Sequence, residues 1–166
     1  GKYKSLFLAN QGDRQARLDA LLDAIAEVYA SVFGPDPILY RFEHGLIDFH
    51  EEMGVMIQEV VGTDVGPYFL PVFAGVAFSS NEFRWSPRLN REDGLVRMVP
   101  GLGTRAVDRI GNDYPVLFSP GQPALRVNAC PDEVRHYSPA HIDVINLEKG
   151  SFQTVRLESL VRDHGN

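Results

Sequence analysis

The sequence predicts an α+β fold in which an N-terminal helix is followed by a mostly antiparallel sheet. Apolar residues recur at helical spacing only near the N-terminus, and strand-like apolar runs follow from residue 55 onward. The two patterns do not alternate along the chain, whereas a parallel β-α-β protein requires regular alternation. A boundary near residue 50 separates a helical part (1–50) from a strand-rich part (51–166) of one domain.

The clearest element is a helix over residues 13–33. Its apolar residues recur at spacings of three and four, which is typical of an amphipathic helix: Leu18, Leu21, Leu22, Ile25, Val28, Tyr29 and Val32. Asp13 is suited to the N-cap, and Gly34-Pro35 ends the pattern. We expect this helix to lie on a core, although a partner-binding helix has the same pattern. Residues 35–50 fit a helix or a strand equally well.

Strands are predicted where apolar runs are bounded by glycine or proline. The runs lie at residues 55–61, 73–79 and 94–99, with shorter ones at 116–118 and 125–127. Residues 143–147 and 152–157 flank Glu148-Lys149-Gly150-Ser151, which indicates a hairpin. The last residues fit a short helix or a frayed end.

Composition excludes several classes of protein. The 166 residues suit one domain, and 16 Lys+Arg against 22 Asp+Glu give a net charge of −6. This acidic balance argues against nucleic acid or an anionic membrane as a partner. The single cysteine, Cys130, excludes an internal disulfide and fits a reducing, cytoplasmic location. No apolar run is long enough to span a membrane. Because the first residue is Gly1, we expect a piece of a longer polypeptide.

The most informative short stretch is Gly101-Leu102-Gly103-Thr104-Arg105-Ala106, which follows an apolar strand. Backbone N–H groups in such a turn can hold phosphate, and the spacing matches G-x-G-x-x-A. However, no acidic residue ends a strand about 20 positions later, as a dinucleotide site requires. A tight turn with positive φ at two glycines explains the pattern equally well.

Arginines gather around this turn although the whole chain is acidic. Six lie within 26 positions: Arg84, Arg88, Arg91, Arg97, Arg105 and Arg109. Guanidinium groups bind phosphate oxygens in pairs, so the cluster favours anion binding. The alternative is surface charge paired with the acids Glu82, Glu92, Asp93 and Asp108.

Other polar groups fit simpler interpretations. The set His44, Asp48, His50, Glu51 and Glu52 lacks the H-E-x-x-H spacing and is better explained as a solvated helix end. The polar residues around Pro131 and Pro139, including His141, are typical of loops. Cys130 has no C-x-x-C partner and is interpreted as structural.

Several motifs in order give the sequence a family resemblance. Met56-Ile57-Gln58-Glu59-Val60-Val61, Gly75-Val76-Ala77-Phe78-Ser79 and Gly101-Leu102-Gly103-Thr104 are similar to the V-Q-x-M-V, G-V-x-F-[ST] and G-L-G-E segments of one nucleotide-binding domain. That domain belongs to the phosphoenolpyruvate synthase and pyruvate phosphate dikinase family. The resemblance extends to about residue 120.

The resemblance implies part of an ATP-grasp domain that binds Mg-ATP. In such a fragment, Gln58 and Glu59 would border the adenine, and Glu92 would be a metal ligand. The remaining nucleotide-binding candidates are Arg97, Gly101, Gly103, Thr104, Arg105 and Arg109. The family transfers the β-phosphoryl group of ATP to a histidine on a second domain, and a third domain then converts pyruvate into phosphoenolpyruvate.

Three departures from the family pattern leave alternatives open. Thr104 stands where the family has glutamate, and no phosphate-binding N-terminal segment or phosphohistidine motif is present. We therefore expect no catalytic residue in this piece and no activity of the piece alone. Its partners would be ATP and the N-terminal subdomain, phosphohistidine domain and pyruvate-binding domain of the same polypeptide. A homodimer through an exposed apolar face is a further expectation. The alternatives are a degenerate nucleotide-sensing or scaffolding module, and a related phosphotransferase with another acceptor.

Overall fold

The computed structural model of the protein describes residues 3–107 and 113–165. Helices come first and antiparallel strands follow, which confirms the predicted α+β class. The chain divides into two compact units, which are described separately. The first contains Gly1–Val60 and Leu147–Ser151, and the second contains Val61–Asn146 and Phe152–Asn166.

The first unit is built from two α-helices joined by a 3-10 turn. Helix α1 spans Arg14–Ala30, η1 spans Ser31–Phe33 and α2 spans Pro35–Glu43. The Asp13 side chain caps α1 by accepting a hydrogen bond from the backbone N–H of Ala16 at 2.8 Å. Such a cap satisfies one of the amide groups that a helix leaves unpaired at its start. Pro35 begins α2, because its fixed φ suits the first turn of a helix.

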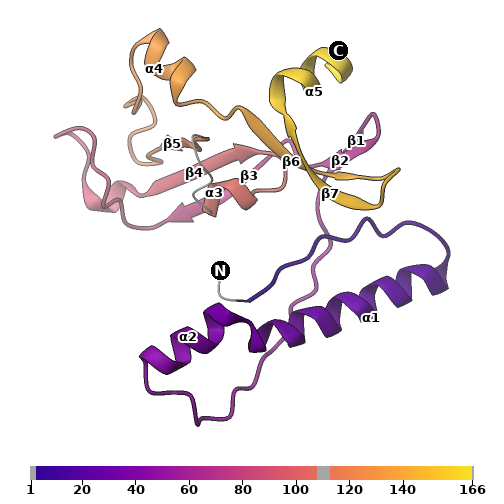
Figure 1. Ribbon diagram of the computed structural model, residues 1–166. Helices are drawn as coiled ribbons and strands as arrows, with labels where there is room; N and C mark the ends of the chain where they lie inside the picture. Colours follow the sequence, from indigo (N-terminus) through magenta and orange to yellow (C-terminus); the bar gives the residue numbers. More distant parts are fainter. Residues whose placement is uncertain (1–2, 108–112, 166) are drawn as a thin grey trace. The chain divides into compact units, whose positions relative to one another are not determined.

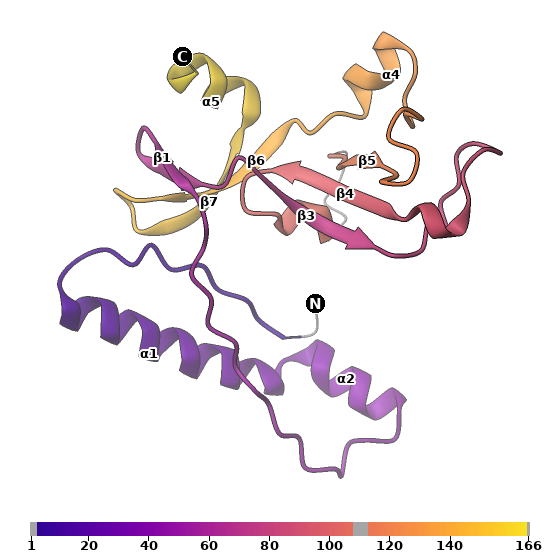
Figure 2. The ribbon, with the colours of Figure 1, turned by 180° about the vertical axis from the view of Figure 1, so that it is seen from behind.

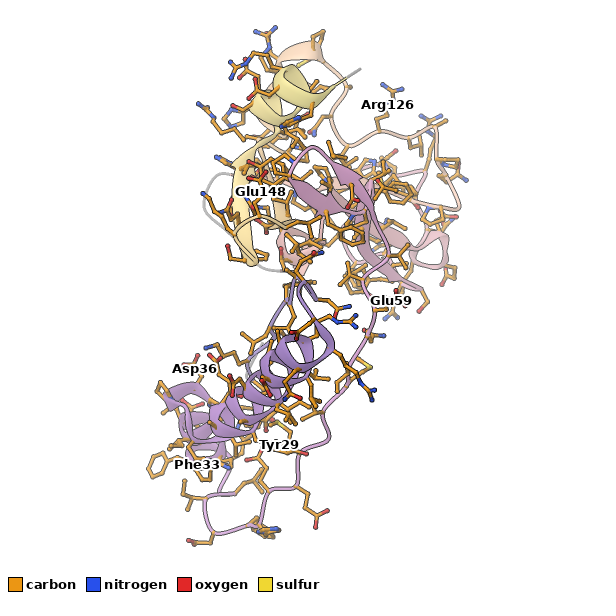
Figure 3. The ribbon with its side chains drawn as sticks, turned by 90° about the vertical axis from the view of Figure 1, so that its right-hand side faces the viewer. Tyr29, Phe33, Asp36, Glu59, Arg126 and Glu148 are labelled. Atoms are coloured by element: carbon orange, nitrogen blue, oxygen red, sulfur yellow. The ribbon has the colours of Figure 1, made fainter. Side chains whose placement is uncertain are left out.

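The apolar stripe of the first helix is only partly covered. No residue of α1 is buried, and the side chains of Tyr29 and Phe33 are exposed (Figure 3). Ion pairs instead tie neighbouring segments to the helices of this unit, with Lys4 joined to Glu27 and Arg41 joined to Glu51. The expected burial of the stripe is confirmed only in part: Val32 is buried and Leu21, Ile25 and Val28 are half-buried, whereas Leu18, Leu22 and Tyr29 are exposed.

The second unit contains a four-stranded sheet in the order β1-β2-β6-β7. Its strands are β1 (Thr63–Val65), β2 (Tyr68–Leu70), β6 (His141–Asn146) and β7 (Ser151–Arg156). Helix α5 (Leu157–His164) follows β7 directly. Leu70, Ile142, Val144 and Leu160 form the hydrophobic core, so one face of this sheet packs against α5. The hairpin is as the sequence indicates, and of the two alternatives for the last residues the helix is the one observed.

A three-stranded antiparallel sheet completes the second unit, in the order β3-β4-β5 (Figure 1). Its strands are β3 (Phe73–Phe78), β4 (Leu95–Pro100) and β5 (Val116–Phe118), close to three of the predicted runs. The 3-10 turn η2 (Arg91–Asp93) precedes β4, and the short helices α3 (Thr104–Val107) and α4 (Pro131–His136) follow β4 and β5. A parallel bridge between Gly101 and Asp143 joins the end of β4 to β6.

Two strand predictions are wrong. Residues 55–61 and 125–127 are irregular, and the first strand begins only at Thr63. The side chains of Met56, Ile57 and Val61 are exposed, so this β-prone run has no neighbouring strand among the described residues. Strand propensity reflects packing against a neighbour, and without one it does not fix a strand. Within the described residues, no helix has the length and apolar character to cross a membrane.

Candidate functional site

The glycine turn after β4 packs closely against β3 and β6 of the second unit. Gly101 and Gly103 have φ angles of +77° and +83°, as the tight-turn interpretation predicts. A Cβ on Gly101 would collide with the carbonyl oxygen of Asp143 on β6. On Gly103 it would come within 2.8 Å of the Ala74 side chain on β3. Both glycines are therefore required by backbone conformation and by close packing.

Asp143 organises the residues that follow this turn. Its carboxylate accepts hydrogen bonds from the hydroxyl groups of Thr104 and Thr154, the latter at 2.6 Å, and from Arg105 Nε at 3.1 Å. Its backbone carbonyl also accepts a hydrogen bond from the N–H of Leu102 at 3.0 Å. Asp143 is 2% exposed, so three donors compensate a carboxylate removed from water.

A second carboxylate holds the other end of the Arg105 side chain. Arg105 Nη1 lies 2.7 Å from Asp113 Oδ2, and both side chains are nearly buried. Asp113 also accepts hydrogen bonds from the backbone N–H groups of Ala140 and His141. Arg105 therefore faces two carboxylates, and its charge is already compensated within the protein.

His141 extends this network to the protein surface. Its Nδ1 lies 3.1 Å from Asp113 Oδ2, and its side chain is about two-fifths exposed. Because a carboxylate oxygen only accepts hydrogen bonds, Nδ1 carries the hydrogen when Asp113 is ionised. The network thus runs from Asp143 through Arg105 and Asp113 to His141.

Arg97 lies in a different environment from Arg105. It occupies the central strand β4, where its cross-strand neighbours are Val76 and Leu117. The residue is half-buried, and its side chain makes no hydrogen bond or ion pair with the described residues. Of the two candidate arginines that the structure describes, Arg97 is the one without a carboxylate partner.

The remaining predicted residues lie on other segments of the chain. Gln58 and Glu59 are exposed in an irregular segment, and Figure 3 shows Glu59 on this segment of the chain. Glu92 is exposed in η2, before β4 begins, whereas the glycine turn follows the end of β4. Six strand residues separate the two by about 17 Å, so one metal ion cannot contact both. Arg109 lies outside the described residues.

The carboxylates of the network do not form a ready magnesium site. Both oxygens of Asp143 are engaged by donors, and Asp113 is held by Arg105 and two backbone amides. Mg²⁺ needs free oxygen ligands in octahedral geometry. No group of three or more His, Cys, Asp or Glu residues arranged to hold a metal occurs in the part of the chain that the structure describes.

Sequence reasoning missed the two aspartates that define the network. The apolar pattern predicts only that Asp143 begins a strand, and Asp113 lies in an irregular segment after α3. The available signal was the acid Asp143 next to the apolar run Val144-Ile145, since charged residues are rarely buried without a partner. Nothing in the sequence pairs it with Thr104 or Arg105, which are about 38 positions away.

The loop between β3 and β4 contains a second polar feature. The side chain of Asn81 is fully buried, and neither its amide nitrogen nor its oxygen has a partner among the described residues. Leaving a buried polar group without a partner costs about 1–3 kcal/mol. Its backbone N–H donates to the carbonyl of Arg91 at 2.7 Å, which holds the two ends of the loop together.

These features define an α+β module whose glycine turn is clamped by a buried charge network. The sequence profile of the pyruvate phosphate dikinase AMP/ATP-binding domain family matches residues 1–160. The chain therefore belongs to this AMP/ATP-binding family. No curated protein and no solved structure matched the sequence.

Proposed function

We propose that the chain is the nucleotide-binding part of a phosphotransferase similar to phosphoenolpyruvate synthase. In the longer polypeptide, ATP, pyruvate and water would give AMP, phosphoenolpyruvate and phosphate through a phosphohistidine on another domain. Membership of the AMP/ATP-binding family supports nucleotide as the ligand. The conversion of pyruvate into phosphoenolpyruvate and the histidine that accepts the phosphoryl group are proposed in addition to nucleotide binding.

Arg97 is the residue we assign to the nucleotide phosphates. Arg97 is a half-buried residue whose strand neighbours are Val76 and Leu117, and arginine carries a positive charge in proteins. No carboxylate among the described residues compensates that charge. A phosphate anion would do so through paired hydrogen bonds, and Mg²⁺ would accompany the phosphates rather than occupy a preformed carboxylate site.

Calorimetric titration of Mg-ATP tests this assignment. We expect Arg97→Gln to weaken binding about tenfold or more, as loss of a charge-assisted contact predicts. Arg135→Gln, an exposed substitution in the last turn of α4, should bind as the unchanged chain does. Equal binding by the unchanged chain and Arg97→Gln would remove Arg97 from the site. No binding by the folded chain, or by a longer polypeptide that includes it, would argue against nucleotide binding.

A second candidate is a nucleotide-sensing or scaffolding module without phosphotransfer. The specific observation is that Thr104, which replaces the family's glutamate, bonds to Asp143, while Arg105 is compensated by two carboxylates. These groups are therefore committed to the fold. Incubation of the longer polypeptide with ATP labelled in the β-phosphoryl group separates the two functions. Acid-labile label on the protein supports the phosphotransferase, and nucleotide binding without label supports the sensing module.

A further inference from the structure

Helix α2, which follows α1 and η1 in the first unit, exposes most of its apolar residues (Figure 2). Of its nine residues only Pro37 is buried, whereas Ile38, Leu39 and Phe42 are 40%, 54% and 70% exposed. Because residues three and four positions apart are neighbours on a helix, Phe42 lies beside both Ile38 and Leu39. The three side chains form an exposed apolar stripe, here called the α2 stripe.

The first unit offers little core that could cover this stripe. Among residues 3–60, only Val32 and Pro37 are buried. Phe33, which ends η1 just before α2, is 77% exposed, and Figure 3 shows its ring pointing away from the helices. Several large apolar side chains exposed together mark an interaction surface in a native protein.

Two carboxylates edge the α2 stripe on one side. Asp36 lies three positions before Leu39 and Glu43 lies four positions after it, so both are helical neighbours of that residue. Both acids are exposed, and neither makes a hydrogen bond or ion pair with the described residues. Arg41 is engaged elsewhere, because it pairs with Glu51. The exposed side of α2 is therefore apolar and negatively charged.

The position of Glu43 is electrostatically unfavourable for the helix itself. It is the last residue of α2, at the end where the helix dipole is negative. The surrounding sequence adds to this charge, since residues 1–60 contain ten Asp+Glu and five Lys+Arg and thus hold −5 of the net charge of −6. A positively charged group of another molecule beside Glu43 relieves this repulsion.

The charge of this surface distinguishes between possible occupants. Two copies that met through the α2 stripe would bring Asp36 and Glu43 of both copies close together, and like charges across an interface oppose association. An anionic membrane is disfavoured for the same reason. A protein groove with lysine or arginine on its rim complements both the apolar side chains and the carboxylates. Amphipathic helices bind other proteins by laying their apolar face into such a groove.

We propose that α2 is a docking helix, which inserts Ile38, Leu39 and Phe42 into an apolar groove of a separate protein with a basic rim. Phe42 is the main anchor, because buried aromatic side chains contribute most to interfaces of this kind. Asp36 and Glu43 pair with the rim and set orientation and association rate. The proposal does not depend on nucleotide binding.

A model groove tests the proposal with the 166-residue chain. The probe is a fluorescein-labelled hairpin of two helices built from leucine and lysine, which presents an apolar groove with a basic rim. We expect its fluorescence anisotropy to rise saturably with the chain. The dissociation constant should be at least about tenfold weaker for Leu39→Ser/Phe42→Ser, as loss of an interface anchor predicts. Phe83→Ser/Val161→Ser removes two exposed apolar side chains from other segments and should bind as the unchanged chain does.

A charge variant tests the same surface with the apolar stripe intact. Asp36→Asn/Glu43→Gln should weaken binding of the lysine probe and reduce the dependence of its affinity on salt, because screening acts on charged contacts. Glu148→Gln/Glu158→Gln removes the same charge from exposed positions in the β6–β7 turn and in α5. This control should keep the affinity and the salt dependence of the unchanged chain.

The contrary outcomes are equally specific. A hairpin with glutamate at every lysine position should not bind, and equal binding of the two probes overturns the proposal. An equal loss in the control variants, or no saturable binding by the folded chain, also overturns it. Self-association in sedimentation that Leu39→Ser/Phe42→Ser abolishes identifies a second copy as the occupant instead. Binding to phosphatidylcholine vesicles that the same variant abolishes identifies a lipid surface and likewise overturns the proposal.

Discussion

The hydroxyl of Thr104 donates a hydrogen bond to the buried carboxylate of Asp143, 39 positions further along the chain. This contact fixes the start of α3 against β6 and gives the Thr104 hydroxyl a partner within the fold. A glutamate there would place a second negative charge beside Asp143, with only Arg105 to compensate both. A neutral side chain at position 104 is therefore consistent with the network.

Thr104→Val should destabilise the protein by about 1–3 kcal/mol, because one oxygen of a buried carboxylate loses a donor. Chemical denaturation monitored by circular dichroism measures the change in the free energy of unfolding. Thr63→Val, on an exposed position of the edge strand β1, removes a hydroxyl group without a buried partner and should change stability little. Equal effects of the two substitutions would show that the contact contributes nothing.

Arg105→Ala should destabilise the fold by about 3–5 kcal/mol, because it leaves Asp113 and Asp143 without their shared cation. Arg91→Ala breaks the exposed pair with Glu82 and should cost less than about 1 kcal/mol. If Arg105→Ala is as stable as Arg91→Ala, the buried network is not a stability element.

Gly103→Ala should destabilise the protein more than Gly150→Ala. Both glycines have positive φ, so each substitution carries a similar backbone strain of about 1–2 kcal/mol. A Cβ on Gly150 meets nothing within 4 Å, whereas on Gly103 it comes within 2.8 Å of the Ala74 side chain. The difference between the two free energies of unfolding isolates the packing of the turn against β3. No difference would mean that the turn relaxes freely.

The Glu133 carboxylate should titrate below its ordinary value. The backbone N–H groups of Ala129 and Cys130 bond to it at the start of α4, which lowers the pKa of Glu133. Because the pKa of Glu133 is lowered in the folded state, its ionised carboxylate stabilises the fold at pH values above the unfolded-state pKa. This stabilisation is lost as the pH falls through the folded-state pKa. Carbon-detected NMR titration of the Glu133 carboxyl measures this midpoint. A midpoint at or above 4.5 would contradict the cap.

Local patterns predicted most of the fold because their signals are short-range. The N-cap at Asp13, the strands β3 and β4 and the C-terminal hairpin depend on spacing and turn residues within a few positions. The strand expected at 55–61 failed because strand formation needs a neighbour, which spacing does not reveal. The same limit explains why the apolar stripe of α1 was expected on a core.

The candidate site was predicted only in part, because arginine function depends on long-range partners. Sequence proximity grouped Arg91, Arg97 and Arg105, yet the fold gives each a different environment. Arg91 pairs with an exposed acid, Arg105 with two buried acids and Arg97 with no described acid. Residues that compensate charge lie up to 38 positions away, so composition near the turn could not distinguish these roles.

The bridge between Gly101 and Asp143 also has a consequence for cooperativity. Each sheet alone is small, and the two share a junction where the Leu102 amide bonds to the Asp143 carbonyl and Arg105 spans both aspartates. Opening either sheet at this junction would expose buried charge, so partial unfolding there is costly. The two sheets are therefore expected to melt as a single unit, with the Leu102 amide among the slowest to exchange its hydrogen with solvent.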